Sequence, residues 1–522
     1  MLKLGGMWGN DPELGLHPAG EADDSVNRLP LDGVLDTYGG RIRVEWDPSA
    51  KVTAFGPLSY FIHFLKTSGL WEEWVNLCPL QFTSNNAPSK EKILGTILLS
   101  ILAGHKRYAH ITTVRSDTVL PELLGMAGIA SEDSVRRAFL KGEESDYTLW
   151  MDRSMNTTFE PLLAEKWVLD IDGTVKTLYG RQEEAKVGYN PTKPGRPSHV
   201  YYAYLISALR MVLNVDVHPG NQMASEFAHP GLFAWLDARP REQWPALLRG
   251  DSAWGTEKTM LQAEARQLPF LFKLRQTEGV LRHVAELARG REWEFAGGGW
   301  RGVESELQLQ GWTKKRRVVI LRRPLAEGTV ATESDSETGQ PVLTGMVVIN
   351  KDRPVYEYAV LVTSLPEGEV LTIAQMYRDR ADAENVFDEL KNQWAWTGFT
   401  THDLRRSQLM ARIVALVFNW WSLYVRLAVP GRHTEAISSR PALVYGIAKK
   451  TSHGNQAKVT ITSYHGKAEA IEAVLTQVGS FLTRFAARAE QLSRPERWAA
   501  LLRVIFREFY SDPAPFGLLA TS

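Results

Sequence analysis

The chain has 522 residues, with 60 Lys and Arg against 60 Asp and Glu, and 44% of its residues are hydrophobic. This hydrophobic content and a charged fraction of 23% exclude a disordered chain, and the length predicts about three domains. The single cysteine, Cys78, excludes a disulfide framework and a cysteine-based zinc site, and the zero net charge means that any basic surface is local.

A targeting or membrane segment is not expected in this sequence. The first residues, MLKLGGMWGNDPELG, lack the long apolar run of a signal peptide. The apolar stretch 411–429 is interrupted by Arg412, Asn419 and Arg426, which argues against a membrane span. We therefore expect a soluble cytoplasmic protein with no membrane partner.

The N-terminal third divides into an arm and a helical domain. Residues 1–55 are rich in Gly, Pro and Asp without a sustained period, which predicts a flexible N-terminal arm. Residues 56–160 have a helical pattern, and the segment SEDSVRRAFLK predicts a short helix that starts at Ser131 and carries Arg136 and Arg137. The range 118–141 is compatible with a DNA-reading helix–turn–helix, and equally with a short structural helix after a turn.

Residues 161–289 have the pattern of an α/β domain. WVLDIDGTVKTLYG (167–180) predicts a buried strand, a turn and a second strand, and 200–217 is apolar and β-branched enough for one or two more. A helix at 225–238, a strand at 245–251, a helix at 256–268 and a strand at 269–275 follow. Strands that alternate with helices indicate a mixed or parallel sheet.

The hydrophobic period changes to two between residues 290 and 370, which predicts a β-rich insertion into the α/β domain. Five strand-like pieces lie there, at 292–300, 303–312, 314–325, 342–351 and 356–365. A helical pattern returns in residues 371–430. Within it, the apolar pattern of 405–428 predicts a long helix, either for core packing or for dimer contact. Residues 431–522 are predicted to be a helical C-terminal region for DNA-end binding or dimerisation.

Two aspartates lie at the ends of predicted strands. Asp172 ends a buried apolar strand and is followed by Gly-Thr, and Asp251 ends the strand PALLRGD. Carboxylates at the ends of neighbouring strands meet at one edge of a sheet, where they can share a divalent cation such as Mg²⁺.

A third acidic segment is TIAQMYRDRADAENVFDELKNQW (372–394). Thr372 and Gln375 have the spacing of a capping box, which predicts that a helix starts there. On one continuous helix the side chains at offsets 0, 3, 7 and 14 fall within about 60° of each other, along roughly 20 Å; they are Tyr377, Arg380, Glu384 and Lys391. A solvent-exposed ion-pair helix gives the same pattern, so the two aspartates are what favours a functional interpretation.

Asp172 within DGT, Asp251 within RGDS and the pattern Y-x2-R-x3-E-x6-K from Tyr377 to Lys391 resemble the DDE transposases of bacterial insertion sequences, in their group-1, cut-and-paste class. VGYNPTKPGRPSH (187–199) and HPGN (218–221) are also similar to this family, and the resemblance covers about residues 130–430. It implies an α/β, RNase H-like catalytic core in two parts, 161–289 and 371–430, interrupted by the β-rich insertion 290–370 and flanked by helical regions. The helical domain 56–160 then becomes a DNA-binding domain.

The resemblance implies a Mg²⁺-dependent endonuclease and strand-transfer enzyme of DNA recombination. It would bind double-stranded DNA at terminal inverted repeats, cleave the ends of the element and join the 3′-hydroxyl to target DNA as a homodimer, with no small-molecule substrate. Two metal ions about 3.5–4 Å apart suit such in-line displacements at phosphorus, and Mn²⁺ can replace Mg²⁺. Asp172 is expected to bridge the ions, with Asp251 on one and Glu384 on the other. Such a protein is expected in the bacterial cytoplasm, at the nucleoid when bound to DNA.

Further DNA contacts are predicted from clustered cations and aromatic residues. Arg380 and Lys391 would hold phosphates, with Tyr377 donating a hydroxyl hydrogen bond to the same strand. Additional candidates are Lys193 and Arg196 in the Pro/Gly-rich loop, Lys314, Lys315, Arg316 and Arg317 in KKRR, and Trp300 or Trp312 for stacking on a flipped base. Solvated charged faces and core tryptophans are the structural alternatives.

Two other functions compete with this interpretation. The chain could be a catalytically inactive DNA-binding relic or regulator of the same descent, although the three acids are intact. VLDIDGTV is also similar to the nucleophile loop of haloacid dehalogenase-type phosphatases, with Asp170 as the nucleophile and Asp172 as the acid. RGDSAWG has no second Asp a few residues after Asp251, and the phosphatase leaves the segment from Tyr377 to Lys391 unexplained.

Overall fold

The computed structural model describes residues 33–507 except positions 46, 83, 85, 141, 223, 289, 290, 326–332, 335–340, 343–355, 397, 432, 455 and 463–465. Residues up to Lys51 form one compact unit, whose described part contains a hairpin of β1 (Gly33–Thr37) and β2 (Gly40–Val44), and residues from Val52 onwards form a second. Residues 1–32 of the predicted arm lie outside the described residues, as does most of the strand predicted at 342–351. The domain boundaries given above remain predictions.

The second unit is a mixed α/β structure around a ten-stranded sheet. The strands along the sheet run in the order β10-β11-β12-β15-β9-β8-β4-β6-β5, and β7 also pairs with β6. Their bounds are β4 Val168–Thr177, β5 Lys186–Val187, β6 Pro197–Ile206, β7 Met211–Pro219, β8 Leu247–Gly250, β9 Phe270–Lys273, β10 Glu294–Gly297, β11 Trp300–Leu307, β12 Arg316–Pro324 and β15 Tyr356–Thr363. Strands β4, β8 and β9 are parallel, whereas β6 is antiparallel to β4 and β15 is antiparallel to β9.

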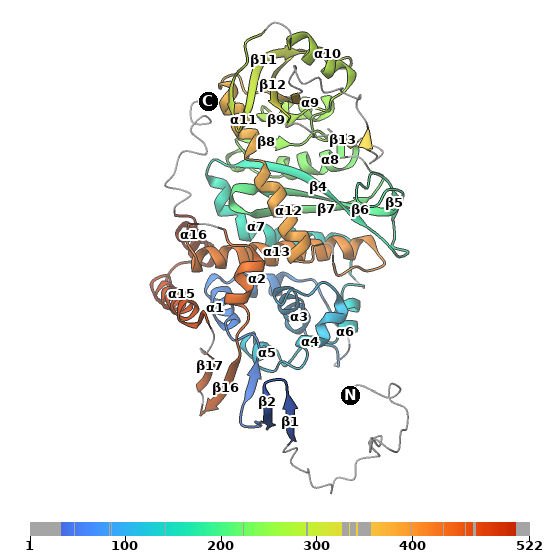
Figure 1. Ribbon diagram of the computed structural model, residues 1–522. Helices are drawn as coiled ribbons and strands as arrows, with labels where there is room; N and C mark the ends of the chain where they lie inside the picture. The colour runs from blue at the N-terminus through green and yellow to red at the C-terminus, as the bar shows by residue number, and fades with distance from the viewer. Residues whose placement is uncertain are drawn as a thin grey trace. The chain divides into compact units, whose positions relative to one another are not determined.

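The described strands from the segment 290–370 continue this same sheet beyond β9, through β15, β12, β11 and β10 (Figure 1). Two short strands, β13 (Glu333–Ser334) and β14 (Pro341–Val342), pair only with each other. Helices that connect the sheet strands are α8 (Ala224–Asp237), α9 (Glu257–Ala265) and α10 (Glu278–Leu287).

Helices from both ends of the chain pack together beside the sheet. The N-terminal ones are α1 Leu58–Ser68, α2 Leu70–Leu77, α3 Lys90–Leu102, α4 Ile111–Val114, α5 Val119–Leu123, α6 Glu132–Ala138 and α7 Glu144–Phe159, with the 3₁₀ turn η2 Tyr108–His110 before α4. The later elements are α11 Val370–Arg378, α12 Ala381–Gln393, α13 Leu404–Ala428, α14 Ala436–Leu443, β16 Ala448–His453, β17 Gln456–Ile461, α15 Ala468–Arg488 and α16 Arg494–Ile505. The hairpin of β16 and β17, extended by β3 (Lys51–Thr53), is absent from the sequence prediction.

Helix α13 is the centre of this packing and lies between strand β7 and the N-terminal helices (Figure 1). Its start is capped by Asp403, whose carboxylate accepts the N–H of Arg406 at 2.7 Å. The amide of Asn419 bonds the N–H and C=O of Val212 on β7, at 2.9 and 2.7 Å. Most side chains of α13 are buried, so core packing is the role that the structure supports for this helix. None of the described helices combines the length and apolar content needed to cross a bilayer.

Two local predictions are wrong, and both concern segments that carry candidate site residues. WVLDIDGTVKTLYG forms one uninterrupted strand, because Gly173 pairs with Tyr202 in regular register and makes room for its ring: a Cβ at this glycine would lie 2.9 Å from the ring carbons. The predicted helix from Thr372 is two helices, since α11 begins after Glu369 and α12 begins after Arg380. At the break, the N–H of Arg380 bonds the carbonyl of Tyr377 at 3.1 Å, three residues back instead of four.

Candidate active site at the ends of β4 and β8

The parallel pairing of β4 with β8 places two acids side by side. The last paired residues are Ile171 and Gly250, and the residues that follow them are Asp172 and Asp251. Both acids line one cavity of about 670 Å³. The two acids therefore lie close together on neighbouring parallel strands, but only Asp251 follows a strand end, since β4 continues past Asp172 to Thr177.

Glu384 reaches the same region from the first turn of α12, and Arg380 connects it to the sheet. The guanidinium of Arg380 donates to Asp172 Oδ2 at 2.5 Å and lies 3.4 Å from Glu384 Oε1. The Arg380 side chain is 7% exposed and that of Asp172 is 16% exposed, whereas Glu384 is 69% exposed. One buried cation thus separates an acid at the sheet edge from an acid on the helix.

The acids influence one another's protonation. Burial, the largest cause, and the negative charges of Asp251 and Glu384 together raise the pKa of Asp172 to about 7, against the opposing effect of Arg380 and the Gly173 N–H. Burial also raises the pKa of Tyr377 to about 12, with contributions from the same acids. Burial alone would lower the pKa of Arg380, but Asp172 and the neighbouring anionic groups raise it. Asp172, Asp251, Glu384, Tyr377 and Arg380 are therefore one electrostatic cluster.

The cluster has the donor chemistry for a divalent cation, but in this structure the guanidinium of Arg380 supplies the positive charge between Asp172 and Glu384. Three carboxylates that repel each other offer the hard oxygen ligands that Mg²⁺ and Mn²⁺ prefer. In the described part of the chain, no group of three His, Cys, Asp or Glu side chains has an arrangement that could hold a metal ion. For the three acids to share a metal, the guanidinium has to leave Asp172, and its neutralising charge is then supplied by the cation.

A buried ion-pair network lies directly beneath the cluster. Arg249 on β8 donates from Nε and Nη2 to both carboxylate oxygens of Asp170 on β4, each at 2.7 Å. Its Nη1 donates to the carbonyl of Met376, next to Tyr377 on α11. This single arginine therefore joins β8 and β4, the strands of Asp251 and Asp172, to α11, the helix that carries Tyr377.

The same network argues against the phosphatase. The side chain of Asp170 is 1% exposed, and the bidentate contact with Arg249 engages both of its oxygens. A nucleophile has to reach its substrate with a free oxygen, which this carboxylate lacks. Asp170 is a structural residue here.

Helix α12 is anchored at its far end by Glu389, which is 1% exposed. Its carboxylate contacts His433 Nε2 at 2.6 Å, and it accepts the N–H of Ala436 at 3.0 Å and the indole N–H of Trp394 at 3.2 Å. Burial by itself would raise the pKa of Glu389, but these hydrogen bonds and the charge of His433 lower it below its usual value. The ionised form of Glu389 therefore holds α12 against α14.

This contact predicts a pH dependence of stability. The pKa of Glu389 is lower in the folded chain than in the unfolded chain, where it is about 4.3. Glu389 therefore adds to the free energy of unfolding above that pH, and this contribution is lost as the pH falls through the pKa of the folded chain. Glu389→Gln should reduce the free energy of urea unfolding at pH 7 and flatten its dependence on pH below the ordinary glutamate pKa of about 4.3. Glu469→Gln, at an exposed position of α15, is the matched control. Equal pH profiles for wild type and Glu389→Gln would contradict the assignment.

Comparison with known proteins identifies the family of this chain. A family model described as "Transposase DDE domain group 1" matches residues 77–476, which is well over half of the chain. The chain belongs to this transposase family. DDE transposases generally use divalent metal ions, in agreement with the donor set of the cluster.

A cryo-EM structure of the piggyBac transposase synaptic complex with hairpin DNA is similar to this chain at 11% sequence identity, with a TM-score of 0.39. The similarity covers 87% of this chain and 85% of that one. No curated protein matches the chain.

The residues predicted to contact DNA lie in different parts of the structure. Tyr377 and Arg380 are in the acidic cluster, whereas Lys391, in the last turn of α12, lines a different cavity, together with Arg136 of α6. Arg137 is exposed and pairs with Asp133 at 3.3 Å. Lys193 and Arg196 are exposed in the loop between β5 and β6, and the Arg196 guanidinium lies 5.7 Å from the centre of the Tyr179 ring.

The KKRR segment is largely engaged within the protein. Arg316 is buried and pairs with Glu257 and Glu264, and Arg317 pairs with Glu304 and donates to three backbone carbonyls. Lys314 lies 3.2 Å from Glu264, whereas Lys315 is exposed. DNA contact by these four residues stays a prediction. Lys315 is the best placed of them to bind a phosphate, because it is exposed and the other three form ion pairs within the protein.

The tryptophans differ in their position relative to the acids. Trp300 is partly buried, with the Arg323 guanidinium 4.9 Å from its ring centre, and is not one of the residues around the cavity of Asp172 and Asp251. Trp312 lines that cavity. Of the two, Trp312 is therefore the better placed to stack on an extruded base.

Sequence reasoning missed several residues that matter near the cluster. Arg249 and Asp170 each precede a predicted acid by two residues, so the strand period places each on the same side of its strand as that acid. Lys176 follows Asp172 by four residues on β4 and lines the cavity of Lys391. The period-two pattern was a usable signal for all three, once the range 167–180 is taken as one strand.

Proposed function

We propose that this transposase binds the terminal inverted repeats of a mobile DNA element, cleaves the element ends and joins the 3′-hydroxyl to target DNA. The observation that carries the proposal is the convergence of Asp172, Asp251 and Glu384 on one cluster at the sheet edge, with Arg380 bonded to the first and paired with the third. Family membership supports the reaction class, and the cluster supports the choice of site.

We also infer that β4, β6, β7, β8 and β9 form an RNase H-like core and that 290–370 is an insertion into it. The order of three strands, helix α8, strand β8, helix α9 and strand β9, followed later by α12, supports this inference. The strand order β7-β6-β4-β8-β9 with only β6 reversed is also in its favour.

Each part of the cluster has a distinct task in this mechanism. Asp172, Asp251 and Glu384 would hold two divalent cations, Mg²⁺ in the cell. Bound there, such ions activate the attacking water or 3′-hydroxyl and stabilise the leaving oxygen. Before a metal binds, the positive charge of Arg380 would neutralise the carboxylate of Asp172. After metal binding, Arg380 can bind a backbone phosphate in the bidentate manner that guanidinium groups favour. Tyr377 is a neutral hydroxyl donor at physiological pH, as an ordinary tyrosine is, and burial raises its pKa further, to about 12.

The proposal includes a homodimer that brings two element ends together and a cytoplasmic, nucleoid-bound location. It is tested with duplex DNA that carries the sequences flanking the reading frame. Wild-type protein should nick this DNA at the element boundary in the presence of Mg²⁺ or Mn²⁺, and chelation by EDTA should stop the reaction. Specific binding without nicking in either metal would instead support the catalytically inactive relic.

A further inference from the structure

A second cavity, of about 880 Å³, shares none of its lining residues with the one that Asp172 and Asp251 line. Four segments of the chain contribute cations to it: the turn before η2, helix α6, the end of β4 with the residues after it, and helix α12. These cations are Lys106, Arg107, Arg136, Lys176, Arg181 and Lys391. No Asp or Glu occurs among the described residues that line it. We call it the basic cavity.

The positive charges of the basic cavity are poorly compensated by the protein. Arg136 has an ion pair, at 3.7 Å with Asp133, which also serves Arg137. Lys106 donates to a neutral group, the carbonyl of Asn392, at 2.9 Å. Like charges held around one concave surface raise the potential inside it and favour an anionic ligand.

Lys176 is the strongest indication of such a ligand. Its ammonium group donates to Thr400 Oγ1 at 2.9 Å and to the hydroxyl of Tyr201 at 3.4 Å, both of which are uncharged. Burial lowers the pKa of Lys176 to about 8, so the group is still mainly protonated at neutral pH. A partly buried ammonium without a carboxylate destabilises the free protein, and an anion in the cavity would remove that penalty.

The basic cavity is connected to the acids by two rigid elements. Lys176 lies four residues after Asp172 on β4, a distance of about 13 Å along a strand. Lys391 lies seven residues after Glu384 on α12, about 10 Å along a helix. Phosphates of one B-form strand are about 3.4 Å apart along the axis, so either distance corresponds to roughly three or four phosphates.

The size and the rim of the basic cavity favour a single strand over a duplex. A volume of about 880 Å³ is that of a pocket for a few linked groups, and a double helix is far wider. Tyr179, which is 72% exposed, is at the rim, with the Arg196 guanidinium close to its ring. Cations that follow a backbone and exposed aromatic rings that stack on bases are the usual combination in single-strand binding.

We propose that the basic cavity is a binding site for the phosphodiester backbone of one DNA strand, the strand that runs from the acidic cluster after the ends have been opened. This inference rests on the proposed function for the identity of the strand. It assigns phosphate contacts to Lys106, Arg107, Lys176 and Arg181, none of which the sequence patterns singled out.

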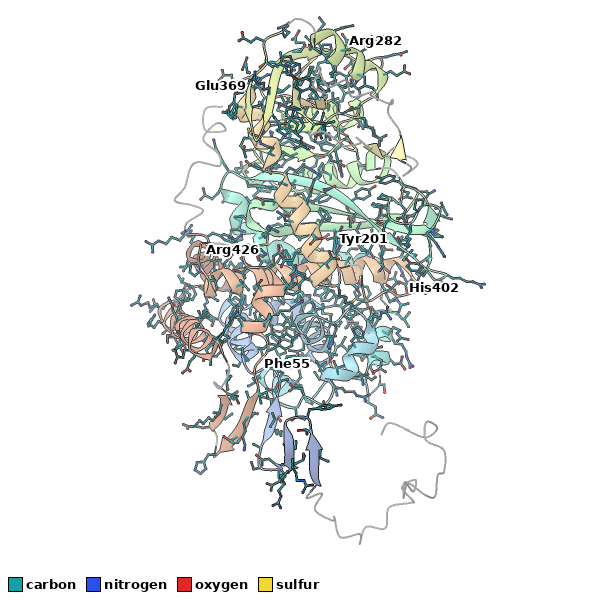
Figure 2. The ribbon with its side chains drawn as sticks, in the orientation of Figure 1. Phe55, Tyr201, Arg282, Glu369, His402 and Arg426 are labelled. Atoms are coloured by element: carbon teal, nitrogen blue, oxygen red, sulfur yellow. The ribbon has the colours of Figure 1, made fainter. Side chains whose placement is uncertain are left out.

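The test compares the salt dependence of single-strand binding by two double variants of the full chain. In Arg107→Gln/Arg181→Gln, two exposed cations of the basic cavity are removed. In Arg282→Gln/Arg291→Gln, two exposed arginines on and after α10 are removed, far from the cavity: Figure 2 labels Arg282 at the top of the molecule, whereas His402, which lines the cavity, and Tyr201, which accepts a hydrogen bond from Lys176, are labelled near its middle. The probe is a fluorescent dT12 oligonucleotide in EDTA, measured by anisotropy from 50 to 300 mM NaCl.

Removing two phosphate contacts should lower the slope of log Kd against log salt concentration by about 1.4, at about 0.7 for each contact with a single strand. The control should keep the wild-type slope. An unchanged slope in Arg107→Gln/Arg181→Gln, or an equal loss in the control, would overturn the proposal. Tighter binding of a blunt duplex of the same length, with the same slope change, would overturn the single-strand assignment.

A third variant, Lys176→Met, separates binding from stability. Because the unpaired charge is removed from a partly buried position, the variant should unfold at a higher urea concentration than wild type, while it binds dT12 more weakly. Weaker binding together with lower stability would indicate a structural role and would contradict the proposal.

The binding experiments involve no metal and no cleavage, so their results are independent of the nicking assay. A slope change without nicking would refute the proposed function alone, and nicking with no slope change would refute the binding site in the basic cavity alone.

Discussion

Asp172→Asn is expected to lower the rate of element-end cleavage by roughly 10³-fold or more, since a lost metal ligand removes several kcal/mol of transition-state stabilisation and each 1.4 kcal/mol is about tenfold. Asp251→Asn and Glu384→Gln should have effects of the same order. Binding of the same DNA should be intact or tighter, because each substitution removes a negative charge near phosphates. Cleavage assays with and without Mg²⁺, paired with binding in EDTA, measure the two quantities separately.

Asp382→Asn is the matched control for these variants. It lies two residues before Glu384 in the first turn of α12 and removes the same charge, but it is outside the cluster. Its cleavage rate should stay close to that of wild type. If Glu384→Gln cleaves as fast as Asp382→Asn, Glu384 is not part of the site.

Arg249→Met is expected to destabilise the protein by about 3–5 kcal/mol, because it leaves the carboxylate of Asp170 buried without its partner. Circular dichroism during urea unfolding would measure this loss. Arg266→Met is a control with almost the same geometry: Arg266 contacts Asp237 through Nε and Nη2, at 2.8 and 2.7 Å, but the two side chains are 24% and 46% exposed. The control should cost about 1 kcal/mol or less.

The network also makes Arg249 a positioning residue for the acids. In Arg249→Met/Asp170→Leu both buried charges are removed, so much of the stability should return. The link from β8 to the carbonyl of Met376 is still missing in that double variant, and its affinity for Mn²⁺ should be lower than that of wild type. Wild-type Mn²⁺ affinity and cleavage in the restored double variant would show that the network is structural only.

The sequence predicted the parts of the site that follow from local patterns. Apolar runs that end in Asp172 and Asp251 predicted two neighbouring strands, which do lie side by side in parallel; the strand end is correct at Asp251, whereas β4 continues past Asp172 to Thr177. The long helix at 405–428 was also correct, because a continuous apolar pattern capped by Asp403 leaves few alternatives.

The errors arise where distant residues decide the local structure. Asp-Gly at 172–173 is a common turn signal, but here the glycine accommodates the ring of Tyr202 from the neighbouring strand. Nothing between Gln375 and Glu384 breaks a helix by composition; the break occurs at Arg380, whose buried guanidinium bonds Asp172. The single polar stripe predicted from Tyr377 to Lys391 is therefore divided, because Tyr377, Arg380 and Glu384 belong to the acidic cluster and Lys391 lines the basic cavity. The basic cavity depends on the packing of α6 and the η2 turn beside β4 and α12.

The most direct test of the central claim is a structure of the protein with Mn²⁺ and element-end DNA, in which anomalous scattering locates the metal. We expect two peaks about 3.5–4 Å apart. Oxygens of Asp172, Asp251 and Glu384 should lie about 2.1–2.2 Å from them, with the Arg380 guanidinium moved from Asp172 to a phosphate. Density for the metal without Glu384 as a ligand, or an Arg380–Asp172 contact that persists in the DNA-bound, metal-soaked protein, would contradict the account.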